Sequence, residues 1–202
     1  MRASKTVMAA PMLASSCTRA SAIAASFGSR HASRAASAAA RSGVTTTTVA
    51  TAATRAAAVI VSSAERARDG AAAPILIRAV VQGDERIPRQ GGLWGNLLTG
   101  PLTNASAALA GRLYGKAAMG PEDIDVAQFY DCFTITVLMQ LEDYGFCARG
   151  EGGPFAASGA LELDGALPIN TSGGNLADGY IHGLSHIVEG VRQLRGQSTA
   201  TV

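Results

Sequence analysis

The sequence predicts an α/β fold with mostly buried strands, and three observations support this prediction. Short apolar runs, such as residues 56–61 and 74–81, are typical of strands that are covered on both faces. Segments with apolar residues at helical spacing follow such runs, and polar, glycine-rich turns separate them. Strand and helix therefore alternate through most of the chain, which is the pattern of an α/β domain.

Residues 1–55 differ in composition from the rest of the chain. They are mostly Ala, Ser, Thr and Arg, and they contain seven of the 17 basic residues but none of the 15 acidic ones. We expect a disordered, low-complexity leader, because few large apolar side chains are available to offset the entropy lost on ordering. An organellar transit peptide has the same composition, and an incorrectly assigned start of the reading frame is the alternative. Residues 56–202 are then the folded domain.

Composition also argues against several classes of function. The acidic residues all lie at or after Glu65, so the folded domain is mildly acidic and lacks the basic stripe of a nucleic-acid-binding protein. The three cysteines, Cys17, Cys132 and Cys147, form neither a disulfide framework nor a paired metal motif. No apolar run approaches the roughly 18 residues of a membrane span. We expect a cytoplasmic protein, or an organellar one if the leader is a transit peptide.

The elements before residue 103 are taken in order. After the strand at 56–61, residues 62–65 supply an N-cap and an acidic first turn for a short helix that ends at Asp69 and Gly70. The strand at 74–81 follows. Residues 84–102 contain four glycines, two prolines and Trp94, so we interpret them as a long functional or partner-facing loop.

The remaining elements place two polar segments next to strand ends. The pattern predicts a helix at 103–119, a strand at 124–129, a helix at 133–146, a glycine-rich loop at 151–165, a short strand at 166–169 and an amphipathic helix at 184–194.

The first polar segment, Tyr130-Asp131-Cys132, follows the strand at 124–129, and open α/β sheets bind ligands at such strand ends. The Tyr130 phenol can donate or accept a proton. Asp131 is either a hydrogen-bonding orienter or a strand-end cap. Cys132 fits a small buried residue better than a nucleophile.

The second polar segment, residues 170–183, contains four glycines and precedes the last helix. Glycines let backbone N–H groups approach a ligand closely, although a turn-rich connector has the same composition. Tyr180 and His182 are its only side chains suited to proton transfer or oxyanion stabilisation near neutral pH. His182 and His186 have the i, i+4 spacing of a metal site, but no third ligand lies nearby, so we expect no metal.

At these two segments the chain resembles the C-terminal half of a thiolase, and more closely the lipid-transfer-protein branch related to sterol-carrier-protein-x thiolase. The resemblance covers about residues 56–202. The motifs that carry it are Val61-Ser62-Ser63-Ala64-Glu65-Arg66-Ala67, Gly120-Pro121-Glu122-Asp123-Ile124-Asp125, Tyr130-Asp131-Cys132-Phe133 and Gln193-Leu194-Arg195-Gly196. The resemblance implies half of a layered α/β/α fold.

Two departures from the thiolase pattern bear on the chemistry. Thiolases carry a histidine in the segment Asn-Pro-x-Gly-Gly…Gly-His-Pro, and Tyr180 stands at its position here. The nucleophilic cysteine of the superfamily belongs to the N-terminal half, outside the part that this chain resembles, and a second cysteine motif would fall beyond Val202. Both departures argue against thiolysis and Claisen condensation by this chain alone, which we expect to be a fragment of an enzyme or a subunit that needs a partner.

The pair of tyrosines resembles instead the branch that cleaves steroid side-chain acyl-CoA thioesters by a retro-aldol reaction. This resemblance implies Tyr130 and Tyr180 as catalytic base and acid, in an order that it leaves open. It also implies substrate-binding roles for Asp131, Asn170, Ser172, Gly173, Gly174, His182 and Gly183. No bound cofactor is implied, and a coenzyme A thioester is the substrate. The alternatives are an acyl-CoA or lipid-binding module without catalysis and an acetyl-CoA acyltransferase-type thiolase.

The resemblance also implies a partner. In a thiolase the two halves pack against each other, so residues 56–202 alone would expose an apolar surface. We expect a homodimer, a partner that supplies the other half, or an OB-fold acyl-CoA-binding subunit.

Overall fold

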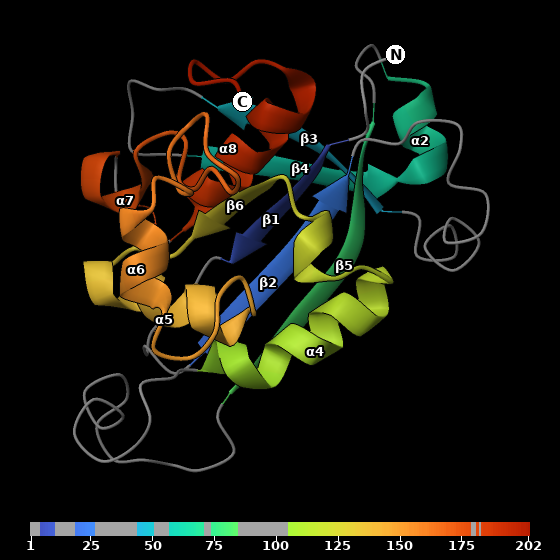
Figure 1. Cartoon of the computed structure of the whole chain (residues 1–202). Coiled ribbons are helices and arrows are strands. Elements are labelled where there is room, and N and C mark those ends of the chain that lie inside the picture. Colours follow the sequence, from blue (N-terminus) through green and yellow to red (C-terminus); the bar gives the residue numbers. More distant parts are fainter. Residues whose placement is uncertain are drawn as a thin grey trace.

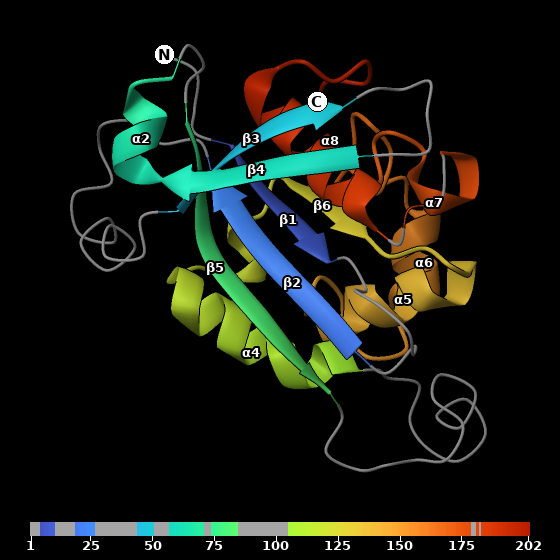
Figure 2. The same ribbon diagram turned by 180° about the vertical axis from the view of Figure 1, so that it is seen from behind.

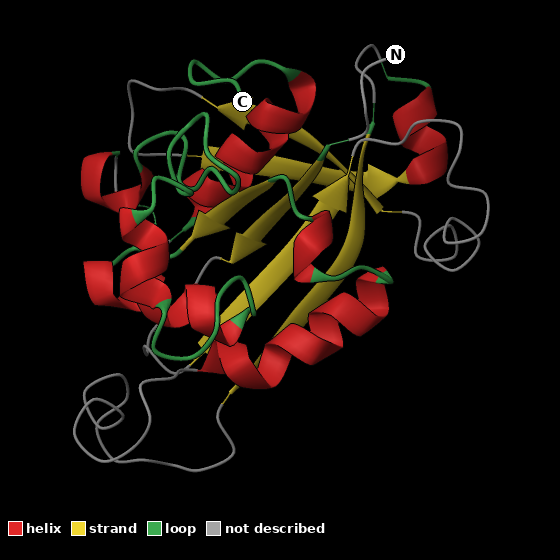
Figure 3. Cartoon of the chain, viewed as in Figure 1, coloured by secondary structure: helices red, strands yellow, loops and turns green. Residues whose placement is uncertain are grey.

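The computed structural model of the chain describes residues 5–10, 19–26, 44–50, 57–70, 74–84, 105–178, 181 and 183–202. These residues form a six-stranded sheet with helices packed against it (Figures 1 and 3). The strands are β1 (Thr6–Ala10), β2 (Arg19–Ser26), β3 (Val44–Ala50), β4 (Ala57–Ser63), β5 (Ile75–Asp84) and β6 (Val126–Phe129). The helices are α2 (Ala64–Arg68), α4 (Ala105–Ala117), the 3-10 helix η1 (Pro121–Asp123), α5 (Thr134–Asp143), α6 (Gly152–Ala157), α7 (Gly174–Ala177) and α8 (Leu184–Arg195). This architecture confirms the α/β class.

The sheet has the order β4-β3-β5-β2-β1-β6. β1 and β6 are parallel, whereas β2 pairs antiparallel with both β1 and β5, and β3 pairs antiparallel with both β4 and β5. Ile169 extends the β6 edge by one parallel bridge to Ala127, so the short strand predicted at 166–169 is reduced to that bridge.

Three of these strands lie in the segment predicted to be disordered. β1, β2 and β3 all fall within residues 1–55, where the sequence analysis expects a disordered leader. The rest of the leader is outside the described residues. Met8 is 0% exposed, and β1 pairs with β6, more than a hundred residues away in the sequence. Composition within the leader gives no sign of this, because β1, β2 and β3 pair with β6, β5 and β4, which all lie outside it.

The two faces of the sheet carry different hydrophobic clusters. Neighbouring residues in a strand point to opposite faces. Val7 and Val126 belong to a cluster with Val191 and Leu194 of α8. Their neighbours, Met8 and Ala127, belong to a second cluster with side chains of α4 and α5. Figure 1 shows α4 along β2 and β5, and α8 close to β1 and β6. β6 is therefore packed from both sides.

β4 forms where a strand was predicted, but it is not buried on both faces. It lies at the edge of the sheet, and Ile60 and Val61 are 55% and 54% exposed. Leu76 and Val80 of β5 are also exposed. From the side shown in Figure 2, no described helix covers β2, β4 and β5. An apolar surface of this kind fits the expectation that half of a layered fold leaves part of its sheet uncovered.

The other elements follow the sequence prediction closely. Ser63 caps α2 by accepting a hydrogen bond from the backbone N–H of Arg66 at 3.4 Å. The predicted helices at 103–119, 133–146 and 184–194 correspond to α4, a shorter α5 and α8. The predicted loop at 151–165 contains α6, which was missed, and residues 85–102 are outside the described residues. None of the helices described is long and apolar enough to cross a bilayer.

The burial of Met8 gives a direct test of β1. We expect Met8→Ala to lower the free energy of unfolding by about 2–5 kcal/mol, because it leaves a cavity between the sheet and α4. Urea denaturation of the 202-residue chain, followed by circular dichroism, measures the effect. Leu163→Ala is the control, since Leu163 is exposed and its loss should cost less than about 0.5 kcal/mol. Equal unfolding midpoints for the two variants would show that β1 is not part of the folded sheet.

Candidate functional site

The two polar segments singled out in the sequence lie side by side at the carboxyl end of β6. The backbone N–H of Ala127 donates to the carbonyl of Pro168, and the N–H of Asn170 donates to the carbonyl of Ala127, each at 3.0 Å. The side-chain Oδ1 of Asn170 also accepts a hydrogen bond from the backbone N–H of Phe129 at 2.7 Å. Asn170 therefore fastens the start of the glycine-rich loop to the last residue of the strand.

The loop then turns through two glycines in the left-handed region. Gly173 has φ of 94° and Gly174 has φ of 66°, a backbone conformation that side chains other than glycine rarely adopt. A Cβ atom at Gly174 would collide with Oδ2 of Asp131. Glycine at this position thus allows the loop to approach the Asp131 carboxylate closely.

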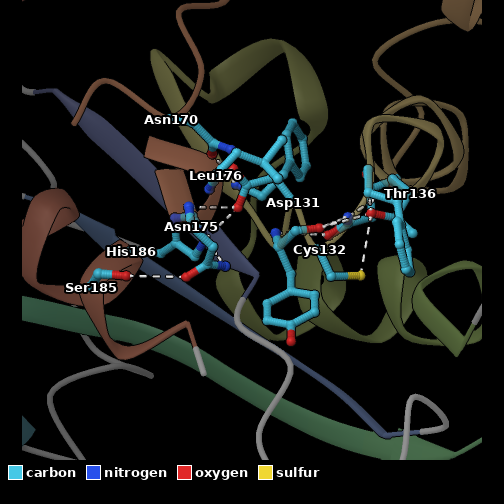
Figure 4. Close-up of polar contacts among 12 residues, drawn as sticks. Asp131, Cys132, Thr136, Asn170, Asn175, Leu176, Ser185 and His186 are labelled. Atoms are coloured by element: carbon cyan, nitrogen blue, oxygen red, sulfur yellow. Dashed lines mark hydrogen bonds and ion pairs between the residues drawn. The ribbon is translucent and has the colours of Figure 1, made fainter. Parts of the chain in front are cut away.

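The Asp131 carboxylate joins three elements (Figure 4). Its Oδ1 accepts a hydrogen bond from the backbone N–H of Asn175 at 2.9 Å, and its Oδ2 accepts one from Leu176 at 3.3 Å. Nε2 of His186, on α8, lies 3.2 Å from Oδ1. Asp131 is only 3% exposed. It connects the end of β6 to the first turn of α7 and to α8.

These contacts explain the ionisation of Asp131. Burial alone would raise the pKa of the carboxyl group. The hydrogen bond from His186, the N–H groups of Asn175 and Leu176 and the charge interaction with His186 outweigh burial, and the pKa lies below its ordinary value. Asp131 is therefore ionised at neutral pH and acts as an acceptor for the loop.

Tyr130, the neighbouring candidate, has a backbone that is held by α5. Nε2 of Gln140 donates to the Tyr130 carbonyl at 2.7 Å, and the Tyr130 N–H donates to Oε1 of Gln140 at 3.3 Å. The hydroxyl of Thr136 donates to the same carbonyl at 3.2 Å. Tyr130 is 6% exposed. Cys132, half-buried, lies 3.8 Å from the Thr136 hydroxyl through its Sγ.

A second buried group, Glu189 on α8, holds the other side of the loop. Its Oε1 accepts hydrogen bonds from the hydroxyls of Thr171 and Ser198 at 2.6 and 2.7 Å and from Nε2 of Gln193 at 3.1 Å. The Thr171 hydroxyl also accepts from Nε2 of Gln128, in β6, at 3.0 Å. The loop is thus anchored next to Asn170 as well as at Asp131.

The structure shows where several of the predicted site residues lie. Asp131, Asn170, Gly173 and Gly174 come together in the loop anchor. The Oγ of Ser172 is buried without a hydrogen-bond partner among the described residues, and Gly183 begins α8. Tyr180 and His182 lie outside the described residues, so the pairing of Tyr130 with Tyr180 and the substrate contacts remain predictions.

Sequence reasoning missed His186, Asn175, Thr171 and Glu189. His186 was considered only as a metal ligand, and the described residues contain no group of three or more side chains placed to hold a metal ion. The missed partners come from elements far apart in the sequence, so spacing gives no signal. The polar residues 186, 189 and 193 on an otherwise apolar helix face are the one available sign.

The fold and the site define an α/β protein whose candidate site lies at a strand end and is closed by a glycine-rich loop docked against the last helix. A family model described as thiolase C-terminal domain-like matches residues 98–202, and the chain belongs to this family. The resemblance and the fold expected from it are confirmed.

Individual relatives add detail. The chain is 44% identical over 150 residues to the 17-hydroxy-3-oxo-4-pregnene-20-carboxyl-CoA lyase of Mycobacterium tuberculosis, covering 69% of this chain and 36% of the relative. It is 43% identical over 139 residues to a steroid side-chain-cleaving aldolase of Thermomonospora curvata, covering 67% of this chain and 34% of the relative.

Among solved structures, an Ltp2-ChsH2(DUF35) aldolase matches with a TM-score of 0.65 and 41% identity, over 70% of this chain and 37% of the other. The chain thus spans about a third of the length of the curated relatives it matches.

The close approach at Gly174 predicts a strong effect of a single methyl group. We expect Gly174→Ala to destabilise the chain by about 2 kcal/mol or more, from the left-handed backbone and the collision with Asp131. Gly153→Ala is the matched control, because nothing lies within 4 Å of its Cβ and alanine favours the helix α6 by about 0.5–1 kcal/mol. Thermal and urea unfolding measure the stability of both variants. A Gly174→Ala variant as stable as Gly153→Ala would contradict the loop geometry.

The lowered pKa of Asp131 predicts a pH dependence of stability. A carboxyl group with a depressed folded-state pKa stabilises the fold above its unfolded pKa, and this contribution is lost as the pH falls through the folded value. We expect Asp131→Asn to cost about 1–3 kcal/mol at pH 7 and progressively less below about pH 4. Asp164→Asn, at an exposed position, controls for the loss of a carboxylate. A cost that stays constant from pH 7 to pH 3 in urea unfolding would show that ionised Asp131 does not hold the loop.

Proposed function

We propose that this chain supplies part of the active site of an enzyme that cleaves a β-hydroxyacyl-CoA thioester by a retro-aldol reaction, with a steroid side-chain thioester as the favoured substrate. The names of the two relatives described above support this proposal. The observation that carries it is the position of Tyr130, fixed at the end of β6 beside the docked glycine-rich loop.

The reaction needs proton transfers but no nucleophile. A base removes the proton from the β-hydroxyl group, the bond between the α and β carbons breaks, and its electrons pass to the thioester as an enolate. The β carbon becomes a ketone. An acid then protonates the α carbon and releases a shorter acyl-CoA. The electrons balance without an oxidant or a reductant.

Tyr130 and Tyr180 are proposed for the two proton transfers, in an order that we leave open. Backbone N–H groups of the glycine-rich loop, with His182 as a further donor, are proposed to stabilise the thioester enolate. The N–H groups of Gly173, Asn175, Leu176 and Asp178 already donate within the protein. The enolate donors are therefore sought among the other N–H groups of the loop. Asn170 and Asp131 support this arrangement by fixing the loop, and Ser172 and Gly183 complete the proposed substrate contacts.

The proposal extends to the substrate carrier, the partner and the compartment. Coenzyme A is proposed to be part of the substrate, as its thioester, and no separate cofactor is proposed. The partner is proposed as a second copy, a chain that supplies the other half of the fold, or an OB-fold subunit of the DUF35 kind that the structural neighbour's name contains. Residues 56–202 are proposed as the thiolase-like domain, to which β1, β2 and β3 add strands. The cytoplasm is the proposed compartment.

Tyrosine-to-phenylalanine variants test the roles of the two tyrosines. We expect Tyr130→Phe and Tyr180→Phe each to reduce cleavage of 17-hydroxy-3-oxo-4-pregnene-20-carboxyl-CoA by about 100-fold or more, because each removes one proton-transfer group. Steroid ketone formation is followed by chromatography, using the chain alone and the chain mixed with the N-terminal half of the Thermomonospora relative. Tyr114→Phe is the control. Tyr114 lies on α4, and its hydroxyl donates to the carbonyl of Tyr144 at 2.7 Å. Loss of this hydroxyl should leave activity within about twofold.

Three outcomes separate the alternatives. Full activity of both Tyr130→Phe and Tyr180→Phe would refute the assigned roles. Binding of the thioester without turnover in every mixture would favour an acyl-CoA or lipid-binding module. Cleavage that requires free coenzyme A as an acyl acceptor would favour an acyltransferase of the thiolase type.

A further inference from the structure

His186 is completely buried, and no role is implied for it by the resemblance or by the names of the relatives. It lies on α8 at 0% exposure, with Nε2 3.2 Å from Oδ1 of Asp131 and 2.9 Å from Nδ2 of Asn175 (Figure 4). Its Nδ1 has no hydrogen-bond partner among the described residues. A side chain so fully enclosed does not touch a substrate. Its contacts instead involve the residues that hold the glycine-rich loop.

The hydrogen on the His186 ring can be assigned from its neighbours. An ionised carboxylate only accepts hydrogen bonds, so the ring nitrogen facing Asp131 must carry a hydrogen. Nε2 is therefore the protonated nitrogen. The oxygen and nitrogen of the Asn175 side-chain amide are told apart by their hydrogen-bond partners. If Nε2 of His186 carries a hydrogen, the amide oxygen of Asn175 is the atom that should face it. The amide nitrogen of Asn175 would then face the hydroxyl oxygen of Ser185 at 3.4 Å, and this oxygen can accept a hydrogen bond from it.

Removing this donor would weaken the whole anchor. Oδ1 of Asp131 accepts from both His186 and the backbone N–H of Asn175, while Oδ2 accepts from Leu176 and lies against Gly174. Without His186 a buried carboxylate would keep only backbone donors from a loop, at a position where unpaired charge is costly. The carboxylate would turn towards water and release the N–H groups of Asn175 and Leu176.

We propose that His186 is a positioning residue of the site: by donating Nε2–H to Asp131 it keeps the glycine-rich loop docked at the end of β6, next to Tyr130. This inference rests on the proposed function for its catalytic consequence, but not for its structural one. Its two consequences are therefore measured separately.

The tautomer is measured first, in the unmodified 202-residue chain. Long-range ¹H–¹⁵N correlation spectra of the labelled protein distinguish a ring protonated on Nε2 from one protonated only on Nδ1. We expect a hydrogen on Nε2. A neutral ring with its only hydrogen on Nδ1 would overturn the proposal, because such a ring cannot donate to Asp131. This measurement needs no variant and does not depend on whether a variant folds.

Two variants then test the donor itself. His186→Gln places an amide N–H near the position of Nε2, whereas His186→Leu has a similar volume and no donor. We expect amide hydrogen exchange at Asn175 and Leu176 to be about tenfold faster or more in His186→Leu and close to the original rate in His186→Gln. The Gly152 amide, which donates to Oε1 of Glu142 at 3.0 Å, is the internal reference and should not change. Unchanged exchange at Asn175 and Leu176 in His186→Leu would overturn the proposal.

The catalytic consequence is measured in the cleavage assay described above. We expect kcat to fall about tenfold or more in His186→Leu and to recover in His186→Gln, with both variants assayed well below their melting temperatures. Faster exchange combined with an unchanged kcat would overturn the positioning role. If the unmodified protein shows no cleavage in any mixture, the proposed function fails, and the exchange data still decide whether His186 holds the loop.

Discussion

The buried carboxylate of Asp131 is the constraint on which the rest of the site depends. A carboxylate withdrawn from water must be paired or hydrogen-bonded, and this one is satisfied by two backbone N–H groups of α7 and by His186 of α8. The loop can approach the carboxylate this closely because position 174 has no side chain. One charge therefore determines the path of the loop, the start of α7 and the direction in which His186 points.

Helix α8 has two functions that its sequence shows only in part. Val191 and Leu194 pack on the sheet, whereas His186, Glu189 and Gln193 are buried polar residues on the same helix. A satisfied buried hydrogen bond contributes only about 1 kcal/mol net, but an unsatisfied partner costs about 1–3 kcal/mol. The polar stripe therefore adds little stability over an apolar one. These polar residues instead hold the loop in place through Asp131 and Thr171.

Sequence reasoning succeeded where a local rule applies and failed where a partner is distant. Tyr130 and Asp131 were placed at a strand end because apolar alternation stops there, and Ser63 was recognised as a helix cap from its neighbours. The strands β1, β2 and β3 were missed, since Ala-, Ser- and Thr-rich segments show no periodicity and these strands pair with β6, β5 and β4, which lie outside the leader. The role of His186 was missed because its i, i+4 neighbour is visible in the sequence, whereas its partner Asp131 lies far away along the chain.

The arrangement around Tyr130 suits a reaction that depends on proton transfer. A general acid or base must lie within hydrogen-bonding distance of the proton that moves. Gln140 and Thr136 fix both the N–H and the carbonyl of Tyr130, so the position of its phenol depends only on its own side-chain rotamer. Asp131, the next residue, holds the loop in place by accepting hydrogen bonds from the N–H groups of Asn175 and Leu176. A retro-aldol reaction benefits from such preorganisation, because its acid and base must be in position before either proton moves.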